Sequence, residues 1–72
     1  MNPPTVPQLQ EQCLRQLARL RERGHPHVDL LEEAIGAVVA GRGYALAARR
    51  LRRTGDRMLI KIAELLEMKS DQ

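Results

Sequence analysis

Glycine divides this chain into four short segments. Four of its five glycines fall in three short stretches, at residues 24, 41–43 and 55, and the apolar side chains between them recur every three or four residues. That spacing puts apolar side chains on one face of a helix, whereas a strand needs alternation. Glycine is also typical of helix ends. The pattern predicts an all-α fold, a compact bundle of four short helices at about residues 5–23, 29–40, 44–53 and 57–68.

Capping residues mark where three of these helices begin. Thr5 with Gln8 three positions later fits a capping box, in which the two residues satisfy each other's free backbone groups. Asp29 has Glu32 at the same spacing and is predicted to cap the second helix. Asp56 follows the break at Thr54–Gly55 and is predicted to cap the fourth.

The composition predicts a thin core made of aliphatic side chains. The 72 residues are 43% hydrophobic, yet they include no Phe, no Trp and a single Tyr. A chain of this size buries only about 60% of its unfolded surface, and one cysteine allows no internal disulfide. Ile62 lies mid-face on the apolar fourth helix, so we expect it in the core. Few residues remain to wall a deep pocket, which argues against most enzymes.

The chain is predicted to form one domain with short ends. Residues 5–69 form the helical domain, residues 1–4 form an extended arm because of the paired prolines, and residues 70–72 form a frayed tail. The arm is either disordered or lies against a partner. Candidate contacts in that case are Pro3, Pro4, Thr5, Val6 and Pro7. No signal peptide or membrane-length apolar run is visible, so we expect the cytoplasm of a bacterial host and no membrane contact.

Positive charge is concentrated between residues 42 and 57. Six arginines and one aspartate give this segment a net charge of +5, and the rest of the chain carries −2 because the whole is +3. The arginines are Arg42, Arg49, Arg50, Arg52, Arg53 and Arg57. They form either a solvated helix face or a contact surface for phosphate or an acidic protein. Such dense like charge costs stability, which favours the contact.

The sequence contains no set of residues for catalysis or for a cofactor. Cys13 lies on an apolar stripe without a neighbouring base, and His25 and His27 lack the further ligands of the usual zinc patterns. We therefore predict no catalytic residues, no metal and no cofactor.

Residues 45–66, ALAARRLRRTGDRMLIKIAELL, resemble a helix-turn-helix unit. An alanine-rich helix is followed by a short glycine-bearing turn and a second helix. The resemblance implies that the second helix enters the major groove, where Arg57 and Lys61 would read bases.

The whole chain is similar to small phage-encoded transcription regulators in its size, its arginine content, its helices and its proline-bearing arm. The resemblance implies a non-catalytic protein that binds bacterial RNA polymerase and either blocks initiation or promotes antitermination, with a nucleic acid contact nearby. Two alternatives stay open. One is a helix-turn-helix repressor that works as a dimer, and the other is a small homodimerisation module with the first helix as its seam.

Overall fold

A computed structural model describes residues 4–70, which form four α-helices and no strand. The helices are α1 (Val6–Arg23), α2 (Val28–Ala40), α3 (Tyr44–Arg53) and α4 (Arg57–Ser70). The predicted all-α bundle is confirmed. Helix α4 runs through Ser70, past the expected end at residue 68, so Ser70 is helical and not part of a frayed tail. The rest of that tail (71–72) and most of the predicted arm (1–3) lie outside the described residues.

The predicted start of α1 is confirmed in detail. The Thr5 Oγ1 accepts a hydrogen bond from the Gln8 backbone N–H at 3.3 Å, and the Gln8 Oε1 accepts one from the Thr5 N–H at 2.9 Å. The helix ends at Gly24, whose φ of +63° lies in the left-handed region. A residue with a Cβ is strained there, and glycine is not.

The predicted N-cap of α2 is wrong by two residues. The helix begins at Val28, its N-cap is His27, and no side chain satisfies the cap. Asp29 therefore already lies inside the first helical turn and cannot act as the cap. The physical reason is the turn through Pro26 and His27, which leads the chain directly into helical backbone. Asp29 still suits its position, because a negative charge near a helix N-terminus opposes the helix dipole favourably.

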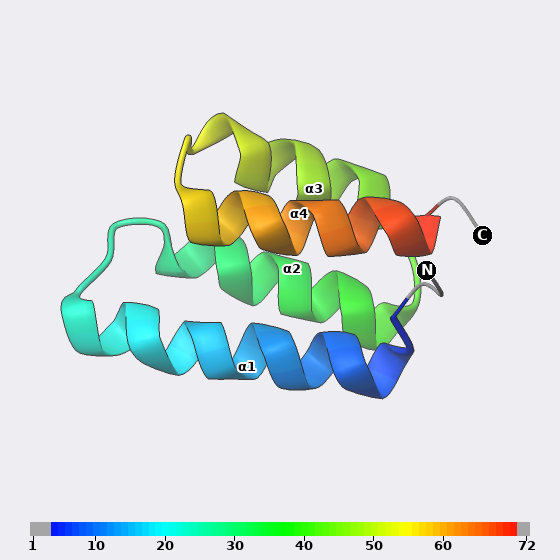
Figure 1. Ribbon diagram of the computed structural model, residues 1–72, viewed down its shortest axis with the longest axis horizontal. Coiled ribbons are helices and arrows are strands. Elements are labelled where there is room, and N and C mark those ends of the chain that lie inside the picture. Colours follow the sequence, from blue (N-terminus) through cyan, green and yellow to red (C-terminus); the bar gives the residue numbers. More distant parts are fainter. Residues whose placement is uncertain (1–3, 71–72) are drawn as a thin grey trace.

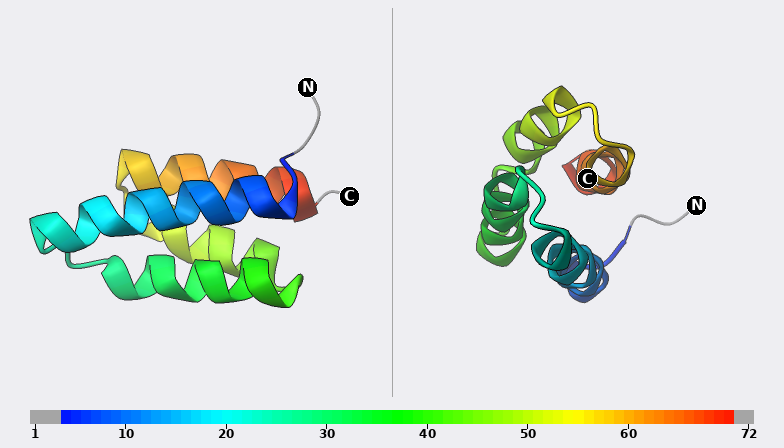
Figure 2. Two further views of the ribbon diagram at one scale, coloured as in Figure 1. Left: turned by 90° about the horizontal axis from the view of Figure 1, so that it is seen from below. Right: turned by 90° about the vertical axis from the view of Figure 1, so that its left-hand side faces the viewer.

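The four helices pack as two antiparallel hairpins. Helix α1 runs against α2, and α3 runs against α4, so that the chain goes up and down in sequence order (Figure 1). Viewed end-on, the helices surround one core, and α4 completes the ring next to α1 (Figure 2). The loops of both hairpins lie at one end of the bundle. The α2–α3 turn lies at the other end, with the start of α1 and the end of α4 (Figure 1).

The core is aliphatic, as predicted, and every helix contributes to it. No charged or polar residue of the described chain is buried in it. Tyr44, the single aromatic residue, only packs against its edge. The buried set consists of Leu9, Cys13, Leu17, Leu20, Leu31, Ala34, Val38, Ala48, Leu51, Leu59, Ile62, Ala63 and Leu66. The apolar stripe of α1 is thus used within the chain itself.

Candidate functional site

The six arginines of segment 42–57 do not form one surface. Arg50 donates a hydrogen bond to Glu33 of α2 at 2.7 Å. Arg52 donates two to Glu67 of α4, at 2.7 and 2.6 Å. These arginines lie on opposite flanks of α3 and connect it to the helix on each side. Two of the six predicted contact residues therefore have intramolecular partners.

The contact between Arg52 and Glu67 is a two-pronged ion pair. Hydrogen bonds from Arg52 are the main cause that lowers the pKa of Glu67 below its usual value, and the same bonds raise the pKa of Arg52. Both side chains remain about half exposed, at 46% for Arg52 and 41% for Glu67. Exposed pairs of this kind contribute little stability, so the pair chiefly fixes where each guanidinium points.

Arg49 and Arg53 behave differently from their neighbours. Both are exposed, and no carboxylate of residues 4–70 lies within 4.0 Å of either guanidinium. One helical turn separates them on the side of α3 opposite the buried Leu51, so their Cβ atoms are about 5–6 Å apart. Leu46, which is 54% exposed, lies on the same side of the helix. We call Leu46, Arg49 and Arg53 the α3 ridge.

The helix itself explains how α3 tolerates so many arginines. Arg50, Arg52 and Arg53 occupy its last turn. The C-terminal end of a helix carries partial negative charge, which attracts cations and offsets part of their mutual repulsion. Helix polarity and two ion pairs thus account for much of the predicted excess charge. Of the six arginines, the ridge pair, Arg42 in the turn before α3 and Arg57 at the start of α4 have no ion pair within residues 4–70.

Arg57 belongs to a different surface. It lines a hollow of about 560 Å³ between α1 and α4, together with Lys61 and Arg19, and no residue of the α3 ridge lines it. The sequence pattern groups Arg57 with the other arginines and does not single out Arg19. Arg19 lies on another helix, 23 positions before Arg42, the first arginine of that cluster. Only the packing of α1 against α4 brings these cations together.

The expected helix-turn-helix geometry is absent. In that motif the two helices meet at about 90–120°, which lets the second protrude into a groove. Here α3 and α4 lie side by side and roughly antiparallel along their lengths (Figures 1 and 2). Helix α4 buries four residues in the core and does not protrude. Arg57 and Lys61 are exposed one turn apart, but not on a helix presented as a reader of bases.

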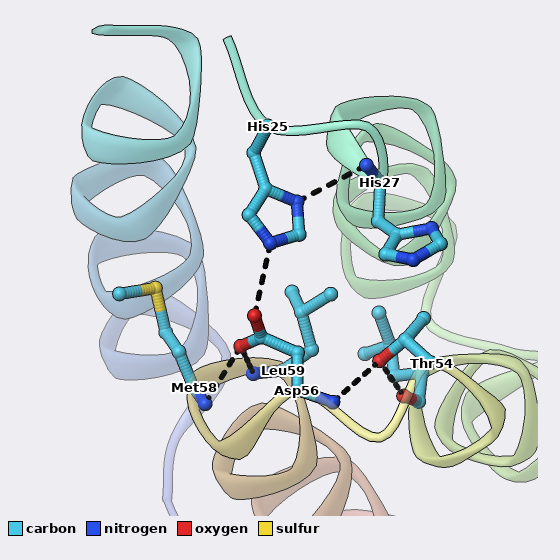
Figure 3. Close-up of polar contacts among 7 residues, drawn as sticks. His25, His27, Thr54, Asp56, Met58 and Leu59 are labelled. Atoms are coloured by element: carbon cyan, nitrogen blue, oxygen red, sulfur yellow. Dashed lines mark hydrogen bonds and ion pairs between the residues drawn. The ribbon is translucent and has the colours of Figure 1, made fainter. Parts of the chain in front are cut away.

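The hairpin loops are joined by a polar cluster (Figure 3). The His25 Nε2 lies 2.9 Å from the Asp56 Oδ2, and the His25 Nδ1 accepts a hydrogen bond from the His27 N–H at 3.1 Å. The other Asp56 oxygen accepts from the backbone of Met58 and Leu59, as the predicted cap of α4 should. Both ring nitrogens of His25 are occupied, so this histidine–aspartate pair is a clasp between the two loops.

The Thr54 hydroxyl, next to the His25–Asp56 pair, also has hydrogen-bond partners within the chain. The Thr54 Oγ1 donates to the Leu51 carbonyl at 2.7 Å and accepts from the Asp56 N–H at 3.2 Å.

Cys13 is buried in the core, and burial raises the pKa of its thiol to about 11, so the thiol stays protonated. Within residues 4–70, no three His, Cys, Asp or Glu side chains gather where a metal ion could be held.

Of the predicted arm contacts, Thr5 and Val6 serve the fold. Thr5 caps α1, and Val6 packs against the core. Pro4 is half-buried and lines a second hollow between α1 and α4, beside Leu65. Pro7 is exposed in the first turn of α1. Pro3 lies outside the described residues.

No protein-family model, curated protein or solved structure matches the chain. None of the helices in the described part of the chain has both the length and the apolar character needed to cross a bilayer.

Proposed function

We propose that this protein is a non-catalytic transcription regulator that binds a bacterial RNA polymerase through the α3 ridge. One observation supports the proposal above the others. Arg49 and Arg53 point outward without a carboxylate partner in residues 4–70, while Arg50 and Arg52 on the flanks of the same helix are held by Glu33 and Glu67. The flanking pairs fix where Arg50 and Arg52 point, and the ridge remains available to an external anion.

The ridge favours a protein surface as its target. Guanidinium groups form paired hydrogen bonds with carboxylates as well as with phosphates. The exposed Leu46 beside Arg49 adds an apolar contact that a phosphate backbone would not use. The resemblance to small phage-encoded regulators points to the same partner. Such a contact is compatible with a block of initiation or with antitermination, and nucleic acid bound to the polymerase would lie close to Arg42.

The test uses purified bacterial RNA polymerase holoenzyme and an immobilised form of this protein. The wild-type chain is expected to retain the polymerase, and a variant with Arg49→Gln and Arg53→Gln is expected to lose at least about tenfold in affinity, as for charged anchor residues at an interface. The matched control carries Arg50→Gln and Arg52→Gln. It removes the same charge from the same helix and is expected to keep most of the affinity.

Transcription from a promoter template gives the functional readout. The wild-type chain should change the yield of initiated or terminated transcript, and the ridge variant should not, while circular dichroism shows equal helicity. Equal losses in both double variants would mean that only net charge matters. Failure to bind polymerase combined with tight, salt-dependent binding to duplex DNA would replace the proposal with a nucleic acid binder.

A further inference from the structure

The seam between α1 and α4 differs from the other helix contacts of the bundle. The other neighbouring helices are consecutive in the chain, whereas α1 and α4 come from its two ends (Figure 2). Two hollows lie along this seam, of about 560 Å³ and about 340 Å³. They share no lining residue but follow one another along α1, and we call the surface that they mark the α1–α4 groove.

The half of the groove nearest the hairpin loops is basic. Arg19 of α1 and Arg57 and Lys61 of α4 line it, all three exposed and without an ion pair within residues 4–70. Glu64 is the one carboxylate in the lining, which leaves a net charge of +2. Arg57 is also the first residue of α4, next to the capping residue Asp56.

The floor of this half includes apolar side chains. Met58 and Ile60 are half-buried and line the hollow. Gln16 lies beside them, and its Oε1 is buried without a hydrogen-bond partner in the described chain.

The other half of the groove is neutral. Glu11 and Arg15 pair with each other at 3.0 Å and cancel. The remaining lining consists of amide and apolar side chains: Pro4, Gln8, Gln12 and Leu65. The groove thus has a direction, with positive potential at one end and none at the other.

We propose that the α1–α4 groove binds an amphipathic helix of a partner protein, with acidic residues at the end that meets Arg57. The partner's apolar side would cover Met58 and Ile60, and its carboxylates would meet Arg19, Arg57 and Lys61. Residues 57–65 of α4 span about 12 Å, so a partner helix of about two turns fills the groove. Nucleic acid is disfavoured, because phosphates would leave the apolar side chains of Met58 and Ile60 uncovered. None of these groove residues belongs to the α3 ridge, so this proposal does not depend on the proposed function.

The probe is a fluorescein-labelled peptide with leucine and isoleucine on one helical face and glutamates at its N-terminal end. Its scrambled isomer keeps the charge and loses the apolar face. Fluorescence anisotropy should show that the probe binds the wild-type chain at least about tenfold more tightly than the scrambled peptide does. A variant with Arg57→Glu and Lys61→Glu should bind the probe about tenfold or more weakly than the wild-type chain does.

The matched control is Arg49→Glu with Arg53→Glu, which makes the same charge change on the α3 ridge and should leave the probe affinity unchanged. Amide NMR shifts on addition of probe should move at Gln16, Met58 and Lys61 and stay in place along α3. Equal binding of probe and scrambled peptide, equal losses in the two double variants, or displacement of the probe by a duplex oligonucleotide would each overturn the proposal.

Discussion

Neither the backbone conformation nor the packing around Gly36 requires glycine at this position. It lies in the middle of α2 and is exposed, and a Cβ added there meets no atom within 4 Å. Its backbone is not left-handed, unlike that of the other four glycines, which have φ between +63° and +80°. Glycine inside a helix costs about 0.5–1 kcal/mol relative to alanine, because it loses more backbone freedom on folding.

Gly36→Ala should therefore raise the free energy of unfolding by about 0.5–1 kcal/mol, measured by urea denaturation. The control is Gly41→Ala, at the end of the same helix. Its φ of +73° strains any side chain, so this change should lower stability even though the added methyl group has room. If both substitutions acted in the same direction, backbone conformation would not be the deciding factor.

At the scale of the element, Asp56 starts α4 and also joins it to the loop before α2. The hydrogen bond with His25 is the main cause that lowers the pKa of Asp56. The backbone hydrogen bonds from Leu59 and Met58 lower this pKa further. A carboxyl group with a lowered pKa in the folded state stabilises the fold above its unfolded pKa of about 3.9. That contribution disappears as the pH falls through the folded value.

Asp56→Asn tests this contribution, because asparagine still caps a helix but carries no charge. We expect a loss of about 1 kcal/mol near neutral pH. We also expect the difference from wild type to shrink as the pH is lowered below about 4, because Asp56 then loses its charge as well. Urea midpoints across this range check both expectations. Glu67→Gln serves as a reference, because the pKa of Glu67 is lowered by another partner. A constant difference at all pH values would show that shape, not charge, matters.

The starts of helices show what local sequence can predict. Thr5 and Gln8 lie within one turn of each other, so their capping box depends on no other part of the chain and was predicted correctly. Asp29 and Glu32 have the same spacing, yet the turn through Pro26 places the N-cap of α2 two residues earlier, at His27. The spacing of two residues inside a helix does not show the conformation of the loop before that helix. Here that loop decides where α2 begins.

At the scale of the molecule, the fold depends on one aliphatic core. Stabilities of about 0.05–0.15 kcal/mol per residue give a chain of this length about 4–11 kcal/mol in total. Ile62, predicted to be in this core, is confirmed there at 3% exposure. A charge at this position would be buried without a partner, which costs several kcal/mol.

Ile62→Asp is therefore expected to unfold the domain, with loss of the helical circular dichroism signal at 25 °C. The control is Leu46→Asp, because Leu46 is 54% exposed and a charge there stays in water. The control variant should remain folded. A helical, soluble Ile62→Asp protein would mean that this face of α4 meets a partner instead of the core.

The pairing of charged side chains could be predicted only in part, because the partners lie on different helices. The sequence shows that four arginines lie close together in α3: Arg49, Arg50, Arg52 and Arg53. It does not show that Arg50 meets Glu33, 17 residues away, or that Arg52 meets Glu67, 15 residues away. The joining of Arg19 with Arg57 likewise depends on how α1 packs on α4. Helical spacing predicts which side chains share a face of a helix. Which helix lies against that face depends on the packing of the whole chain.

The hairpin order of the bundle also has a kinetic consequence. Most contacts form between helices that follow each other in the chain, so the contact order is low, and proteins of this kind fold within microseconds to milliseconds. Contacts between α1 and α4 close the longest loop and carry the largest entropic penalty. We expect these two helices to be the last to meet during folding and the first to separate in native-state fluctuations.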